Sequence, residues 1–236
     1  MLLDLENIVR THKLHIRGVL HIGAHYGEEN QVYDRLQIKS RLFIEPLPTN
    51  FQILSQTIKN FPLLNIAIGN ENKEIEMHVE IANNSMSSSI LKPKLHLLQY
   101  PHITFDSKVN VQMRRLDEVA FARKDYNFIN MDIQGYELEA LKGSTKTLRY
   151  IDFILTEVNR EELYENCARI QDITTFLNFF DFELMEISWA GNTWGDAFFI
   201  KKSKIKKLRH LLYSTATSLA RPPLRSIRAL RKLYQR

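Results

Sequence analysis

The sequence predicts an α/β protein built on a Rossmann-like, mostly parallel sheet of seven strands, with the last strand antiparallel. Three observations lead to this fold class. From about residue 17 to 200, short apolar runs alternate with amphipathic stretches. Three such alternations fit into the first 68 residues, and three of the apolar runs end in an acidic residue. Repeated strand–helix alternation is typical of βαβ units, whose strands pair in parallel.

The first half of the chain supplies three strands and two helices in turn. Apolar runs and helical spacing predict strands at 18–23, 42–45 and 63–68, with helices at 27–38 and 48–60. In the second of these helices Pro48 lies in the first turn, and one face carries Phe51, Leu54 and Ile58. This pattern is typical of an amphipathic helix that covers a sheet.

The segment from 70 to 116 interrupts the alternation. Residues 74–81 alternate as in an antiparallel or edge strand, and 109–113 form another short strand. Between them, residues 82–108 are polar and irregular, with a serine cluster at 85–89. A long loop inside a compact domain is usually functional or mobile. We therefore expect these serines to belong either to a lid over a ligand site or to a flexible polar loop.

The second half of the chain resumes the alternation. It predicts strands at 126–132 and 151–157, a final antiparallel hairpin of 182–187 with 197–200, and helices that begin at Leu116 and span 135–148 and 169–180. Gly191 and Asn192 supply the turn of the hairpin. With the three strands of the first half, this gives the seven strands of the predicted sheet.

Composition places the chain among globular proteins and excludes several other classes. Hydrophobic residues make up 44% and charged residues 25%, so the chain can bury a core and is not disordered throughout. The single cysteine, Cys167, excludes an intrachain disulfide. The first residues include acids where a secretory signal needs cations, and no apolar run approaches the length of a membrane span. We expect a cytoplasmic protein that is at most membrane-peripheral.

The net charge of +5 conceals a division of the chain. Residues 201–236 hold 12 Lys and Arg and no acid, which leaves residues 1–200 with a net charge of −7. We expect an N-terminal helical extension at 1–17, one domain at 18–200, and a basic tail at 201–236 that is either amphipathic or disordered. Such a tail fits an anionic membrane surface. The acidic body disfavours nucleic acid as a partner.

The clearest chemical signal lies at the ends of the first two strands. Gly23 and Gly27 bracket the loop after the first strand and let the backbone pass close to a ligand. Glu45 ends the next strand about twenty residues further on, where a carboxylate can accept both hydroxyls of a ribose. The loop lacks the dinucleotide fingerprint and the P-loop pattern. A cofactor with a ribose but no phosphate therefore fits, namely S-adenosylmethionine (SAM); an ordinary strand–helix turn is the alternative.

With these motifs the sequence resembles the FkbM-type SAM-dependent methyltransferases over residues 18–200. The matching segments are 19–29, 43–46, 65–69, 141–143, 155–157, 194–197 and, most specific, the run NMDIQGYE at 130–137. The resemblance implies the class I methyltransferase fold and methyl transfer to an oxygen, often on a sugar. It also implies that SAM contacts Gly23, Ala24, His25, Gly27, Glu45, Asn65 and Asp132. His21 stands where many methyltransferases carry an acid, and His25 where many relatives carry Asn.

Three acids are candidates for catalysis. Asp132 ends the fourth core strand and could orient the acceptor, take its proton or help to hold SAM. Glu157 ends the next strand and could reach the acceptor. Glu137 lies in the first turn of a predicted helix, where a charge interaction with the helix end is the alternative role. His25, in the cofactor loop, is either a base or a packing residue.

The other histidines and the tryptophans give weaker signals. His78, His96 and His102 lack the spacing of metal ligands, so we predict no metal site and place them on the surface or in loops. Trp189 and Trp194 flank the last turn. They form either part of the core or an aromatic wall for a sugar ring.

The sequence thus predicts a SAM-dependent O-methyltransferase that acts on a hydroxyl of a saccharide, glycan or related small acceptor. A nucleic-acid methyltransferase is one alternative, prompted by the basic tail. The segment after the fourth strand lacks the Asp/Asn-Pro-Pro-aromatic run usual in base amino-methylation. A non-catalytic SAM-fold binding module, tethered by its tail, is the other. The acids at three strand ends argue against that module.

Overall fold

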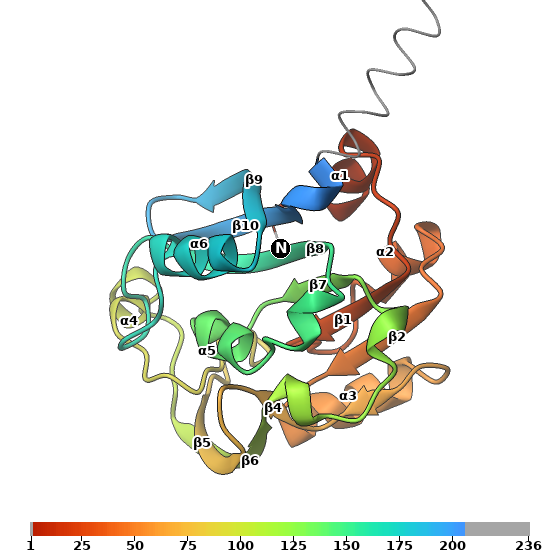
Figure 1. The fold of residues 1–236 in the computed structure, drawn as a ribbon. Helices are drawn as coiled ribbons and strands as arrows, with labels where there is room; N and C mark the ends of the chain where they lie inside the picture. Colours follow the sequence, from red (N-terminus) through yellow and green to blue (C-terminus); the bar gives the residue numbers. More distant parts are fainter. Residues whose placement is uncertain (1, 206–236) are drawn as a thin grey trace, which may run out of the picture. The chain divides into compact units, whose positions relative to one another are not determined.

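Seven strands form the main sheet of the computed structural model, which describes residues 2–205 (Figure 1). Their order is β3-β2-β1-β7-β8-β10-β9. Their bounds are β1 Gly18–Ile22, β2 Ser40–Ile44, β3 Leu63–Leu64, β7 Phe128–Met131, β8 Phe153–Asn159, β9 Phe182–Ala190 and β10 Trp194–Lys201. β10 is antiparallel to both β8 and β9, whereas the other pairs are parallel. The predicted seven-stranded sheet with an antiparallel last strand is confirmed.

The central strands are buried along their whole length, which explains their unbroken apolar runs. Every residue of β1, β7 and β8 is buried. Strands covered on both faces are apolar on both faces, as in other parallel sheets. From β1 the strand order continues outward to β2, and from β7 to β8. The point between β1 and β7 is therefore the place where an open α/β sheet binds its ligand.

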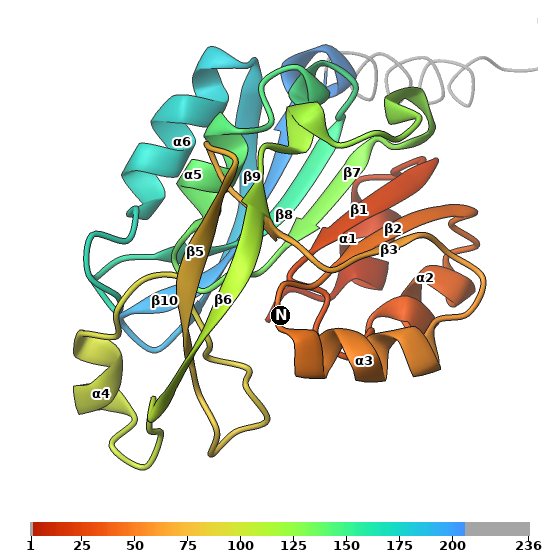
Figure 2. The ribbon, with the colours of Figure 1, turned by 90° about the horizontal axis from the view of Figure 1, so that it is seen from below.

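Short helices cover both faces of this sheet (Figure 2). They are α1 Leu5–Thr11, α2 Asn30–Arg35, α3 Pro48–Thr57, α4 Leu95–Gln99, α5 Glu137–Lys142 and α6 Ile170–Phe179, with 3-10 turns at Leu116–Glu118, Arg123–Asp125 and Thr147–Arg149. The helix α6 packs on β8 and β9, and α5 packs on α6 and β8. Figure 2 shows α2 and α3 on the opposite side.

The prediction of one strand at 63–68 is wrong, because this segment forms two short strands that belong to different sheets. Leu63–Leu64 joins the main sheet, whereas β4 (Ala67–Ile68) joins a second sheet of order β4-β6-β5, with β5 at Lys73–Val79 and β6 at Ser107–Arg114. The Asn65 side chain causes the break, because its amide donates to the backbone carbonyls of Glu45 and Pro46 instead of continuing the strand. The predicted antiparallel strand at 74–81 is β5.

Three predicted helices are shorter in the structure. The helix predicted at 27–38 spans only Asn30–Arg35, because Gly27 and Gln37 have positive φ. The helix predicted at 135–148 ends at Lys142, because the chain beyond it is held by the Asp117 carboxylate, which accepts hydrogen bonds from the Lys146 and Thr147 N–H groups. The helix predicted to begin at Leu116 is a single 3-10 turn.

Two sequence predictions concern the ends of the chain. The predicted N-terminal extension contains α1, with Asp4 as its N-cap. The compact unit that carries all the described strands ends at Lys201. Most of the predicted basic tail lies outside the described residues, so its amphipathic character and its membrane surface stay predictions. Within residues 2–205, no helix is long and apolar enough to cross a membrane.

Candidate active site

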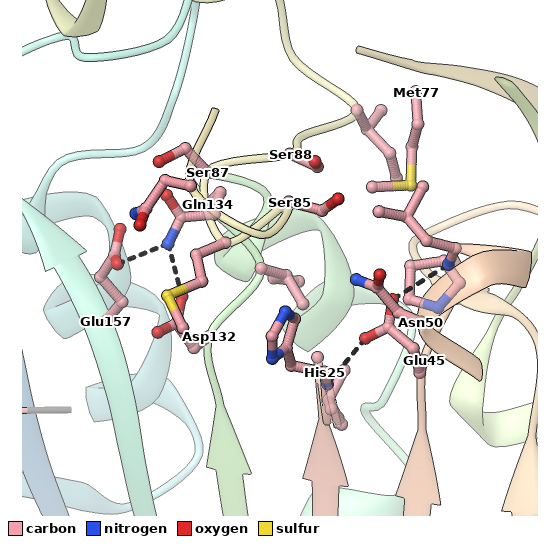
Figure 3. Close-up of a pocket in the computed structure, with 18 of the residues that line it drawn as sticks. His25, Glu45, Asn50, Met77, Ser85, Ser87, Ser88, Asp132, Gln134 and Glu157 are labelled. Atoms are coloured by element: carbon pink, nitrogen blue, oxygen red, sulfur yellow. Dashed lines mark hydrogen bonds between the residues drawn. The ribbon is translucent and has the colours of Figure 1, made fainter. Parts of the chain in front are cut away.

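A cavity of about 680 Å³ opens at the carboxyl ends of β1, β2, β7 and β8 (Figure 3). It lies at the switch point of the sheet, where the order of the strands predicts a ligand. Predicted site residues from all four strand ends line it, namely Gly23, His25, Glu45, Asp132 and Glu157. The remaining predicted site residues do not line the cavity: Asn65 is exposed, and Ala24, Gly27 and Glu137 are buried.

Glu45 is fixed by two backbone groups at the end of β2. The N–H of His25 donates to its Oε2 at 2.9 Å, and the N–H of Leu47 donates to its Oε1 at 3.0 Å. Burial raises the pKa of this carboxyl to about 7, against the lowering effect of the two N–H groups. The Asn50 side chain also bonds this carboxylate, whose two oxygens together keep a lone pair for a hydroxyl group in the cavity.

The loop after β1 is shaped by residues in the left-handed region. Gly23, His25 and Gly27 have φ of 81°, 47° and 86°. A Cβ on Gly23 would lie 1.9 Å from the Asp132 carbonyl oxygen, so only glycine permits this close approach of two loops. Ala24 is fully buried, and its N–H donates to Ile44 in β2. This loop therefore joins β1 to both neighbouring strand ends.

His25 connects the cofactor loop to the opposite wall of the cavity. Its Nδ1 lies 2.7 Å from Glu28 Oε1, and its Nε2 lies 2.7 Å from the carbonyl oxygen of Asn84. Burial lowers its pKa, but the bonds to Glu28 and Asn84 outweigh this and raise it overall. Because both ring nitrogens face acceptors, the geometry fits a packing role as an imidazolium and not a base.

Asp132 and Glu157 form a pair of carboxylates joined by a third side chain (Figure 3). Gln134 Nε2 donates to Asp132 Oδ1 at 2.7 Å and to Glu157 Oε2 at 2.8 Å. Burial raises the pKa of Glu157 well above its usual range, and the carboxylates of Asp132 and Glu137 raise it further. A carboxyl with a raised pKa at the edge of the cavity makes Glu157 a candidate proton acceptor.

Gln134 is a residue of the site to which the sequence analysis gave no role. Its φ is 53°, and that of Gly135 is 97°, so the chain turns sharply after β7. The Tyr164 hydroxyl lies 2.9 Å from Gln134 Oε1, and Ser89 Oγ donates to the Gln134 carbonyl at 2.7 Å. The sequence does hold a signal for Gln134, because this residue lies within the most specific motif, 130–137. Its contact with Tyr164, thirty residues further on, has no local sequence signal.

The Glu137 side chain holds the turn after β7 through hydrogen bonds to its backbone. It is fully buried, and its Oε1 accepts from the N–H groups of Ile133 and Gly135, both at 3.1 Å. Its Oε2 has no hydrogen-bond partner among the described residues. Burial raises its pKa to about 7, and the Asp132 charge adds to this. The geometry favours a structural role for Glu137 over contact with the acceptor.

A lid, residues 80–90, lies across the cavity from the strand ends. Ser85, Ser87 and Ser88 face the cavity from this lid (Figure 3). It is held at three points: His25 contacts the Asn84 carbonyl, Ser89 the Gln134 carbonyl, and Tyr164 the Ser87 carbonyl. Ser87, Ser88 and Ser89 are all buried. The structure thus favours a lid over the flexible polar loop.

Aromatic residues close the far end of the cavity, and one sequence prediction is wrong here. His96 lies in helix α4, is 4% exposed and lines the cavity, so it is neither a surface nor a loop residue. Its ring packs against those of Tyr100, Phe105 and Tyr164. Trp194 also lines the cavity, and its Nε1–H donates to the Tyr100 hydroxyl at 2.9 Å. Helix α4 brings His96 here, which no local sequence pattern indicates.

Acidic side chains dominate the charged groups of the cavity wall. Five carboxylates line it, and among the described lining residues there is no Lys or Arg. The set is Glu28, Glu29, Glu45, Asp132 and Glu157. Such a wall attracts cations and neutral polyols and repels phosphates. It fits SAM, whose sulfonium and ammonium groups are positive and whose ribose presents two hydroxyls to a carboxylate.

The strand order, the antiparallel seventh strand and this cavity fit a Rossmann-like, SAM-dependent methyltransferase. Residues 21–184 match the methyltransferase FkbM domain. The 2-O-methyltransferase NoeI of Sinorhizobium fredii is 30% identical over 174 residues, which cover 69% of this chain and 72% of NoeI. The chain belongs to the FkbM methyltransferase family.

Solved structures give more distant likenesses. A ribosomal protein L11 methylase from Lactobacillus delbrueckii subsp. bulgaricus is 12% identical, with a TM-score of 0.48, over 84% of this chain and 76% of that one. A magnesium protoporphyrin IX methyltransferase from Synechocystis PCC 6803, with bound SAM, is 8% identical, with a TM-score of 0.44, over 78% of this chain and 69% of that one.

Proposed function

We propose that this protein transfers the methyl group of SAM to a hydroxyl of an uncharged saccharide or related small polyol. The observation that carries this proposal is the carboxylate pair Asp132–Glu157, which Gln134 joins at the edge of the cavity. The 2-O-methyltransferase named among the relatives supports an oxygen as the acceptor atom. The absence of Lys and Arg among the described lining residues supports an acceptor without phosphate.

The proposed chemistry needs alignment and one proton acceptor. SAM supplies a methyl group on a sulfonium, which is already electrophilic. The acceptor oxygen forms a bond to that carbon as the carbon–sulfur bond breaks, and the hydroxyl proton passes to the carboxylate pair. Asp132 and Glu157 orient the hydroxyl, and the raised pKa of Glu157 brings its basicity closer to that of the group it serves. Gln134 keeps both carboxylates in place.

The cavity divides between the two ligands in this proposal. Glu45 holds the ribose hydroxyls, and the loop from Gly23 to Gly27 passes alongside the cofactor. Asn65 acts on the cofactor indirectly, because its amide donates to the backbone carbonyls of Glu45 and Pro46 and so fixes the end of β2. The aromatic end with His96 and Trp194 receives the acceptor ring.

The experiment uses the full chain. Calorimetric titration with SAM and with S-adenosylhomocysteine measures cofactor binding first. Transfer of labelled methyl from SAM is then measured on a panel of neutral oligosaccharides, matched sugar phosphates and uronic acids, and on RNA, with Asp132→Asn as the control variant. We expect transfer to neutral sugars that this variant loses. Transfer to RNA alone would replace the proposal with the nucleic-acid alternative, and cofactor binding without transfer to any arm would favour the binding module.

A further inference from the structure

A row of buried polar groups runs beneath the cofactor loop from β7 to α2. Asn130 Nδ2 donates to the Tyr33 hydroxyl oxygen at 2.7 Å, and the Tyr33 hydroxyl lies 3.3 Å from His21 Nδ1. On the other side of the ring, His21 Nε2 lies 3.8 Å from Glu29 Oε2. Asn130, Tyr33 and His21 are buried, whereas the Glu29 side chain is 34% exposed and lines the cavity. The row therefore ends at a carboxylate that ligands can reach.

The histidine in this row is neutral. Burial lowers the pKa of His21, although the nearby charges of Glu29, Asp132 and Glu28 act in the opposite sense. Because the Tyr33 hydroxyl keeps its proton, it donates to Nδ1, and the ring hydrogen sits on Nε2, facing Glu29. A neutral imidazole beside the Glu29 carboxylate does not cancel its charge.

The other four carboxylates of the cavity wall are already engaged. Glu45 accepts from two backbone N–H groups. Glu28 contacts the His25 ring at 2.7 Å and accepts from the Tyr26 N–H. Asp132 and Glu157 share the Gln134 amide, as described above. For Glu29, the described residues offer only the long contact to His21.

The position of Glu29 matches one end of SAM. Glu29 contacts the ring of His21 in β1, and His21 pairs with Asn130 in β7. The Asp132 N–H donates to the Ile22 carbonyl, so Glu29 and Asp132 both lie beside the β1–β7 pair. Glu45 lies at the end of β2, where the ribose is placed. A ligand whose ribose is at Glu45 and whose sulfonium faces Asp132 therefore brings its amino-acid portion to the side of the cavity that carries Glu29.

We propose that Glu29 binds the α-ammonium group of SAM. The inference rests on SAM binding, which follows from the family, and is independent of the acceptor. The carboxylate for the amino-acid portion then comes from the N-cap of α2 and not from β1, where His21 stands.

The test compares two ligands on matched variants of the full chain. Calorimetry measures the Kd of SAM and of 5′-methylthioadenosine, which lacks the amino-acid portion, for the unaltered protein, Glu29→Gln and Glu28→Gln. We expect Glu29→Gln to weaken SAM binding by about 10- to 100-fold, the range for a hydrogen bond to a charged group. Binding of 5′-methylthioadenosine should change by less than about twofold, because the lost contact is absent from that ligand.

The control variant separates a contact from a general charge effect. Glu28→Gln removes the same charge from an adjacent position, so we expect it to weaken SAM binding far less than Glu29→Gln does. Equal weakening by both variants, or equal weakening of both ligands by Glu29→Gln, would overturn the proposal. Retained binding of 5′-methylthioadenosine also shows that the variant is folded. If the unaltered protein bound neither SAM nor 5′-methylthioadenosine, SAM binding itself would be contradicted, and not only the role of Glu29.

Discussion

The two halves of the cavity are built in different ways. The half that we assign to the cofactor comes from β1, β2 and the loops that follow them, and backbone N–H groups of His25 and Leu47 fix its main carboxylate. The half that we assign to the acceptor is assembled from side chains of β8, β10, α4, the lid and the segment after β7, joined by the amide of Gln134. Backbone-built sites are local in sequence, whereas side-chain-built sites depend on tertiary packing. We therefore expect substitutions in one half to change the binding of SAM and substitutions in the other half to change the rate of methyl transfer.

The largest expected effect falls on the acceptor half. Asp132→Asn keeps the shape of the side chain but removes a proton acceptor, so methyl transfer should fall by about 10²- to 10⁴-fold, the usual contribution of a general base. Single-turnover rates at saturating SAM measure this. An unchanged rate on an acceptor that the unaltered protein methylates would show that Asp132 takes no proton.

Glu157 should make the rate of methyl transfer depend on pH. Burial and the charges of Asp132 and Glu137 raise its pKa, so its basic form appears only as the pH rises and the transfer rate should climb with it. Glu157→Gln should lower the rate by about 10²-fold and flatten this climb. A rate–pH profile for each protein is the measurement. A climb of the same shape in the variant would assign it to another group.

The cofactor half predicts a binding effect instead. Glu45→Gln leaves one side-chain oxygen and no charge for the ribose hydroxyls, so the Kd of SAM should rise by about 10- to 100-fold. Calorimetry of the full chain measures it, with Glu71→Gln, an exposed substitution outside the cavity lining, as the control. If Glu45→Gln left the Kd unchanged, the ribose would have to lie elsewhere.

A smaller effect is expected at the aromatic end. His96→Phe keeps the ring packing with Tyr100 and Phe105 but removes the ring nitrogens. The KM for the acceptor should rise about tenfold, as for one lost hydrogen bond, while the Kd of SAM stays the same. Steady-state kinetics measures the KM for the acceptor, and calorimetry measures the Kd of SAM. A change in SAM affinity without a change in KM would move His96 into the cofactor half.

The smallest expected effect concerns stability. Glu137 has a folded-state pKa of about 7, raised by burial and by Asp132. Between about pH 4.5 and 7 the folded chain keeps this proton while the unfolded chain releases it, so stability falls as the pH rises through that window. Glu137→Gln should flatten the fall by roughly 1–3 kcal/mol in urea unfolding. A fall of unchanged size would assign it to Glu45 or Glu157.

The same contrast explains what the sequence could predict. The fold and the cofactor half follow from local patterns: apolar runs that end in acids, and Gly23, Gly27 and Glu45 at fixed spacing. The acceptor half could be predicted only in part, because Asp132 and Glu157 end strands but their alignment depends on Gln134 and Tyr164. The sequence predicts His96 on the surface or in a loop, since nothing near it in the sequence indicates that α4 folds over the cavity.

The attachment of the lid has a consequence for turnover. Ser89 and Tyr164 tie the lid, directly and through the Ser87 carbonyl, to the same Gln134 that aligns the two carboxylates. Any movement of residues 80–90 away from the strand ends would break the hydrogen bond from Ser89 to Gln134. Opening the cavity to solvent would therefore loosen the side chain that aligns Asp132 and Glu157. We expect the carboxylates to be aligned for proton transfer only while the lid covers the cavity.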